Sequence, residues 1–70
     1  MDLKENRITV RELLATVAAR EVLRRELPDI YGSPLLRMAQ NMTLEQVLHL
    51  AQGRIPAEKV RLVLEELRRL

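Results

Sequence analysis

The chain has 70 residues with one histidine, one tyrosine and no cysteine, tryptophan or phenylalanine, so a disulfide is impossible and a structural zinc site lacks ligands. Its net charge of +2 is too small to indicate a nucleic-acid partner by itself. No apolar run reaches the length of a membrane-spanning helix and no basic-then-apolar signal opens the chain, so we expect a cytoplasmic protein without membrane, metal or cofactor binding.

The first eight residues are mostly polar, and we expect residues 1–8 to form a flexible N-terminal segment ahead of one helical domain over residues 9–70. A chain this short has a marginal core, so association with a partner is a further source of stability. The excess of arginine over lysine is compatible with a thermostable protein or with a GC-rich genome.

Thr9, followed three residues later by Glu12, is a capping-box pattern ahead of an apolar run. The apolar positions recur at helical spacing, but their phase shifts near Thr16, which is itself a good N-cap residue. The pattern predicts helices at about 10–15 and 17–27, with one kinked helix as the alternative.

Pro28 ends the second helix, and residues 29–32 read as a connector. Ser33 and Pro34 are the start signal of a short third helix. Asn41 can close that helix in the left-handed conformation.

Thr43 and Gln46 form a second capping box, at the start of a fourth helix that Gly53 ends. Pro56 lies in the first turn of a fifth helix, which runs to the end of the chain. No segment shows strand alternation. The fold class is therefore all-α, a compact orthogonal bundle of about five short helices.

Aliphatic residues on the inner faces of these helices form the expected core: Leu13, Leu14, Val17, Val22, Leu23, Leu27, Leu35, Leu36, Met38, Leu44, Val47, Leu48, Ile55, Val60, Val63, Leu64 and Leu67. On the outer face of the last helix, Glu65 lies four residues from both Arg61 and Arg69, a spacing that allows ion pairs. The segment Thr9–Leu14 also resembles Thr43–Leu48, which we interpret as two similar capped helices rather than a true repeat.

The sequence offers no catalytic constellation. His49 has only Glu45 near it on one helix face, so we interpret it as a solvated or half-buried side chain rather than a base or a metal ligand. The adjacent Glu65 and Glu66 point about 100° apart on a helix, which does not suit paired-carboxylate chemistry. We therefore expect a protein that is not an enzyme.

The leading hypothesis is a non-catalytic protein-interaction or accessory module that can also associate with itself. Leu62 falls off the main apolar stripe of the last helix, so it could face a partner. Tyr31 and Met42 are further candidate contacts, since tyrosine and methionine are enriched at interfaces. The expected partner is a protein, either a second copy of the chain or a domain of a parent enzyme.

The alternative hypothesis is a helix-turn-helix DNA-binding domain over residues 43–70, with Arg54, Lys59 and Arg61 as candidate DNA contacts. The same helix carries three glutamates that would repel phosphate, and no Asn, Gln or Ser at its start to read base edges. Nucleic acid is therefore the less favoured partner.

The order of motifs also resembles a small helical module found at the C-termini of some bacterial carbohydrate-active hydrolases and esterases. The residues that carry this resemblance, within residues 8–70, are Thr9–Leu14, Ala18-Ala19, Val22-Leu23, Leu27-Pro28, Met42-Thr43-Leu44 with Gln46, and the last helix. The chain departs from the module at Thr16-Val17, where the module has Asn-Pro. The resemblance implies an accessory helical module rather than a catalytic domain, with no catalytic residues to carry over.

Overall fold

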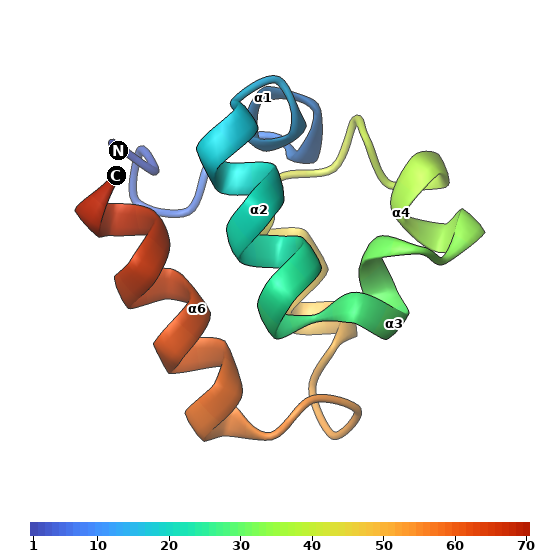
Figure 1. The fold of residues 1–70 in the computed structure, drawn as a ribbon. Coiled ribbons are helices and arrows are strands. Elements are labelled where there is room, and N and C mark those ends of the chain that lie inside the picture. The colour runs from blue at the N-terminus through green and yellow to red at the C-terminus, as the bar shows by residue number, and fades with distance from the viewer.

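Six helices and no strand make up the computed structural model, which describes residues 1–70 (Figure 1). The helices are α1 (Val10–Leu14), α2 (Val17–Glu26), α3 (Pro28–Tyr31), α4 (Pro34–Met38), α5 (Leu44–Leu50) and α6 (Ala57–Arg69). The all-α class is confirmed. The additional helix is α3, a single turn that lies largely within the predicted connector, with Pro28 as its first residue.

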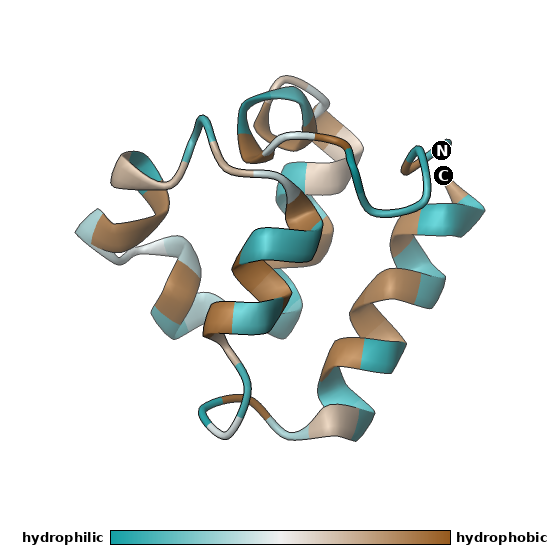
Figure 2. Cartoon of the chain, turned by 180° about the vertical axis from the view of Figure 1, so that it is seen from behind, coloured by the Kyte–Doolittle hydropathy of each residue, from teal (hydrophilic) through white to brown (hydrophobic).

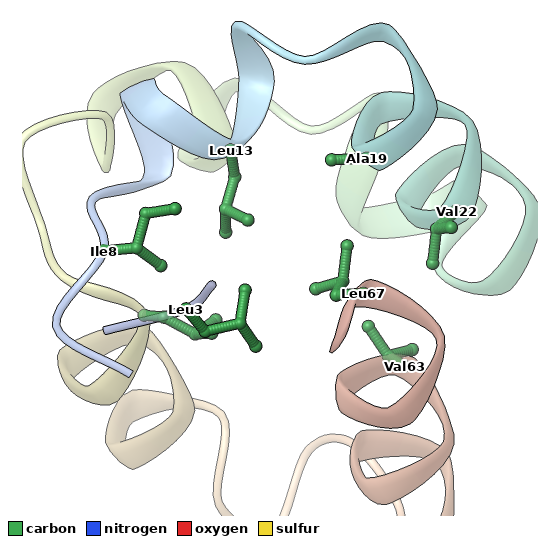
Figure 3. Close-up of a cluster of buried hydrophobic side chains, with 8 residues drawn as sticks. Leu3, Ile8, Leu13, Ala19, Val22, Val63 and Leu67 are labelled. Atoms are coloured by element: carbon green, nitrogen blue, oxygen red, sulfur yellow. The ribbon is translucent and has the colours of Figure 1, made fainter. Parts of the chain in front are cut away.

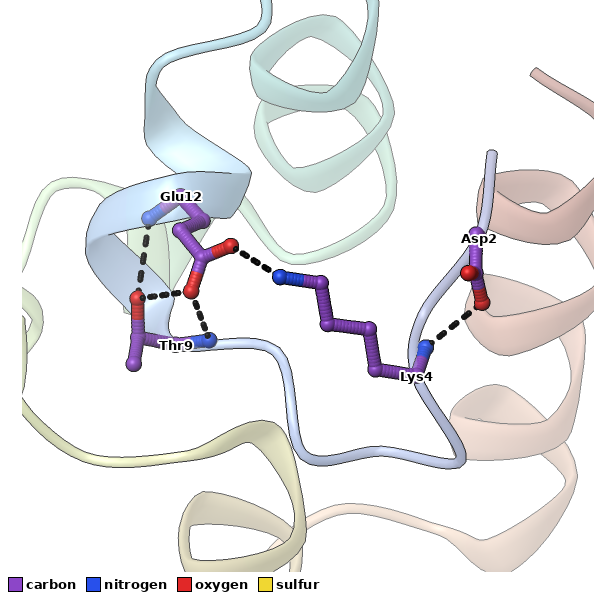
Figure 4. Close-up of polar contacts among 4 residues, drawn as sticks. All are labelled: Asp2, Lys4, Thr9 and Glu12. Carbon is purple, nitrogen blue, oxygen red and sulfur yellow. Dashed lines mark hydrogen bonds and ion pairs between the residues drawn. The ribbon is translucent and has the colours of Figure 1, made fainter.

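Both predicted capping boxes are formed. At the start of α1, the Glu12 backbone N–H donates to Thr9 Oγ1 over 3.2 Å, and Thr9 N–H donates to the Glu12 carboxylate over 3.4 Å (Figure 4). At the start of α5, Gln46 N–H donates to Thr43 Oγ1, and Thr43 N–H donates to Gln46 Oε1. These bonds satisfy backbone N–H groups that the first turn of a helix leaves without an acceptor.

The two threonines also join two segments that are far apart in the sequence. Thr9 and Thr43 form an isolated antiparallel β-bridge, in which Val10 N–H donates to the Met42 carbonyl over 2.9 Å and Leu44 N–H donates to the Ile8 carbonyl over 2.7 Å. The similar segments noted in the sequence thus begin side by side.

The break between α1 and α2 lies where the apolar phase shifts. Thr16 is extended, with φ −100° and ψ 122°, so α1 and α2 are separate helices rather than one kinked helix. The side chain of Thr16 accepts no capping hydrogen bond, contrary to its predicted role. The guanidinium of Arg20 instead donates to the Leu14 carbonyl at the end of α1 over 3.2 Å.

Two predicted helix ends differ from the structure. Asn41 is not left-handed; its side-chain oxygen accepts a hydrogen bond from Arg11, and α4 has already ended at Met38. Gly53 is left-handed, at φ +81°, but it lies in the connection after α5 rather than at the end of the helix.

A single apolar cluster fills the space between the N-terminal segment, α1, α2, α5 and α6 (Figure 3). The buried residues are Leu3, Ile8, Val10, Leu13, Ala19, Val22, Leu44, Val63 and Leu67. Three residues of the expected core are instead exposed, namely Val17 at 63%, Leu35 at 62% and Met38 at 80%. Val17 lies off the Ala19–Val22 face of α2, and α4 packs mainly against the short α3, so its apolar side chains meet no second surface.

The N-terminal residues contribute to this core, although we predicted a flexible segment there. Leu3 and Ile8 are each only 4% exposed. Lys4, Glu5 and Asn6 between them are all left-handed, with φ of 54°, 56° and 69°. This turn reverses the chain so that both apolar side chains point inward.

A polar contact also fastens the turn to α1. The Lys4 ammonium lies 3.0 Å from the Glu12 carboxylate (Figure 4). This hydrogen bond, followed by the one from the Thr9 backbone, holds the pKa of Glu12 below its ordinary value.

Leu67→Ala should lower the free energy of unfolding by about 2–5 kcal/mol, because the side chain is fully buried and its loss leaves a cavity. Leu35→Ala, at an exposed position of the expected core, should change it by less than about 0.5 kcal/mol. Urea unfolding followed by circular dichroism measures both. Equal effects would contradict the core described above.

Glu5→Gly should raise the free energy of unfolding by up to about 1 kcal/mol, because glycine adopts the left-handed conformation without the steric cost of a side chain. Glu65→Gly, in the exposed middle of α6, is the matched control and should lower it by about 1 kcal/mol. The same urea experiment checks the signs. A loss of stability in both variants would show that the turn at residues 4–6 is not strained.

Candidate protein-interaction site

The longest helices of the chain, α2 and α6, lie side by side in opposite directions (Figure 1). Their buried faces meet through Ala19 and Val22 of α2 and Val63 and Leu67 of α6. Colouring by hydropathy shows the banding of α6 into hydrophobic and hydrophilic residues (Figure 2). The hydrophobic side covers α2, which leaves the edges of both helices to form a common surface.

Ion pairs fasten one edge of this helix pair. The Glu26 carboxylate at the end of α2 lies 3.0 Å from the Lys59 ammonium of α6 and 3.3 Å from the Arg25 guanidinium. Arg25 in turn pairs with Glu66 of α6. The hydrogen bond from Lys59, and after it the one from Arg25, holds the pKa of Glu26 below its ordinary value.

An open groove runs between α2 and α6. Its lining consists of Ala18, Glu21, Val22, Arg25, Leu62, Glu65, Glu66, Arg69 and Leu70. The four apolar residues of this set include Leu62 at 41% exposure and Leu70 at 46%, both high for large aliphatic side chains. We call this surface the α2–α6 groove.

Charged side chains line the rim of the α2–α6 groove, and not all of them are paired within the chain. Glu21 pairs with Arg24, and Glu66 pairs with Arg25. Glu65 and Arg69 take part in none of the ion pairs of the structure. The expected pairs of Glu65 with Arg61 and Arg69 are thus not formed.

The structure places only one of the three predicted partner contacts in this groove. Leu62 lies in it. Tyr31 ends α3 and Met42 precedes α5; both are half-buried, and neither lines the groove. The three residues therefore do not form one site.

Sequence reasoning missed Ala18 and Arg25 as groove residues. Ala18 and Ala19 are adjacent on α2, but Ala19 is fully buried whereas Ala18 is exposed. The sequence pattern that could have identified them is the spacing of Ala18, Glu21 and Arg25. These residues are three and four positions apart and therefore share one side of the helix.

The candidate DNA contacts are dispersed. Lys59 is engaged with Glu26, Arg54 lies in the connection between α5 and α6, and Arg61 is exposed on α6. The helix that would enter the major groove packs on α2, and its connection to α5 runs from Ala51 to Pro56, longer than a helix-turn-helix turn. This arrangement does not favour the DNA-binding alternative.

The remaining polar candidates do not converge. His49 and Glu45 are both exposed on α5 and make no hydrogen bond or ion pair with each other. The structure contains no group of three or more His, Asp or Glu side chains placed to hold a metal ion.

No protein-family model, curated protein or solved structure matches this chain. None of the six helices has both the length and the apolar composition that crossing a membrane requires. The geometry of the α2–α6 groove is thus the main structural guide to function.

Glu26→Gln should destabilise the chain at neutral pH, because it removes the charge that Lys59 and Arg25 neutralise. The pKa of Glu26 is lower in the folded than in the unfolded chain, so its contribution is present at neutral pH and is lost on acidification. The difference in stability between Glu26→Gln and the unaltered chain should therefore shrink as the pH falls from about 5 to about 3.

Thermal unfolding over that pH range measures this effect. The control is Glu58→Gln, which alters a carboxylate of α6 that has no ion pair. If the stability lost in Glu26→Gln and the stability lost in Glu58→Gln change with pH in the same way, the Glu26 pairs do not stabilise the fold.

Proposed function

We propose that this chain is a non-catalytic helical module that binds another protein through the α2–α6 groove. The observation that carries the proposal is the exposure of Leu62 and Leu70 at one groove, beside the small Ala18 and above the buried Val22. Exposed aliphatic side chains gathered in a hollow and rimmed by polar groups are typical of a protein-binding surface.

The charges of the rim support the same function. Apolar centres surrounded by charged side chains match the anatomy of protein interfaces, in which the rim stays solvated and the centre is desolvated. The proposed partner is a helical surface, because a groove between two helices accepts the apolar face of a third. The resemblance to a C-terminal accessory module agrees with a role in assembly rather than in catalysis.

Selection from a displayed library of amphipathic helical peptides tests the proposal without a known partner. Peptides that bind the unaltered chain should lose at least about tenfold in affinity for Leu62→Glu, because the variant buries an unpaired carboxylate in the groove. Leu35→Glu is the matched control, an exposed leucine on α4 outside the groove, and should retain binding.

Circular dichroism shows that each variant is folded. The proposal is overturned if no peptide is enriched, or if the enriched peptides bind Leu62→Glu as well as they bind the unaltered chain.

A further inference from the structure

We propose that the partner of the α2–α6 groove is the same groove of a second copy of this chain, in a two-fold symmetric contact with the two α6 helices antiparallel. This inference rests on the proposed function, since it names the occupant of that site. Two features of the groove carry it: the positions of its exposed leucines and the order of its charges.

The two ends of the groove carry different residues. The pairs Arg25–Glu66 and Glu26–Lys59 place the C-terminal end of α2 beside residues 59–66 of α6. Since the helices are antiparallel, the N-terminal part of α2 with Ala18 lies toward the Leu70 end of α6 (Figure 1). One end therefore presents Leu62, and the other presents Leu70 beside the small Ala18, with both leucines partly exposed.

These ends are complementary to each other across a two-fold axis. In a two-fold contact, residue i of one copy meets residue j of the other, and j meets i. Leu62 and Leu70 are eight residues, about 12 Å, apart along α6, with Glu66 midway. An axis near Glu66 places Leu62 of each copy over Ala18 and Leu70 of the other, so the exposed leucines of both copies are covered at once.

The two unpaired charges of the groove fit the same arrangement. Glu66, which the axis places opposite Glu66 of the other copy, is already paired with Arg25 of its own chain. The lining of the groove carries three glutamates and two arginines, a nearly balanced set that does not select a strongly acidic or strongly basic partner. Glu65 and Arg69, which have no ion pair within the chain, lie on either side of the proposed axis. The two-fold contact brings Glu65 of each copy near Arg69 of the other, which forms two reciprocal pairs.

The size of the groove sets the expected strength. Stable interfaces bury about 800 Å² on each partner, and the whole chain has a surface of 5051 Å². The groove is lined by 9 residues, fewer than the roughly 20–30 per side of a standard interface. The contact is therefore a weak dimer that forms and dissociates with protein concentration.

Light scattering after size exclusion measures the molar mass, over a dilution from about 1 mM to about 10 μM. The unaltered chain should approach twice its 8.1 kDa at the highest concentration and return to the monomer mass on dilution. Glu65→Arg and Arg69→Glu should each weaken self-association by roughly tenfold or more, because each puts like charges opposite one another.

An equimolar mixture of these two variants is the decisive sample. In the mixed dimer both reciprocal pairs again join an arginine to a glutamate, so the dimer mass should return. Repulsion between positions 65 and 69 inside each variant chain is the same alone and mixed, so it cannot produce this recovery. Arg61→Glu, on α6 outside the groove, is the control and should dimerise like the unaltered chain.

The inference is overturned if the unaltered chain stays monomeric throughout, if the single variants dimerise normally, or if their mixture does not recover. Its failure is distinguishable from failure of the proposed function. A monomeric chain whose groove still binds selected peptides in a Leu62-dependent way keeps the function and excludes the second copy. A monomeric chain that binds no peptide excludes both.

Discussion

The antiparallel pairing of Thr9 with Thr43 is the contact on which the rest of the structure depends. Each threonine is extended and begins a capped short helix, so the bridge fixes where α1 and α5 start relative to each other. The longer helices α2 and α6 follow these short helices and pack against one another. Two hydrogen bonds across the bridge thus relate the two halves of the chain, whose apolar faces then close one core.

A core of this size explains why the surface keeps apolar character. Only nine residues are buried, and short helices such as α4 cannot place all of their aliphatic side chains against a second surface. Small domains bury a smaller fraction of their apolar area than large ones, so a contact that covers exposed leucines lowers the free energy of the assembled state. The α2–α6 groove is where such side chains gather between two long helices, which is why it suits a partner.

The ion pairs give this groove a defined geometry. Arg25 and Glu66 join α2 to α6 across the groove, and Lys59 with Glu26 adds a second link at the same C-terminal end of α2. These pairs neutralise charged side chains that a ligand could otherwise contact, including Lys59. Glu65 and Arg69 remain without partners inside the chain, and their order along α6 makes the surface complementary to itself when a second copy is turned by 180°.

The sequence by itself indicated five of the six helices, because caps, prolines and apolar periodicity act within a few residues; it missed the single turn of α3. Both capping boxes, the break near Thr16 and the start of α4 at Ser33 are local effects of this kind. It also indicated Leu62 as a side chain outside the core. Whether a side chain is buried depends instead on which surface faces it, so Val17, Leu35 and Met38 could not be assigned from periodicity.

Only the tertiary structure decided which residues far apart in the sequence are in contact. It brought Leu3 and Ile8 into the core through a left-handed turn at residues 4–6. It joined Lys59 to Glu26, which are far apart in sequence, and it separated Tyr31 and Met42 from Leu62. The groove arises from the packing of α2 on α6. These helices are far apart in the sequence, and the local sequence pattern of each helix does not determine which helix it packs against.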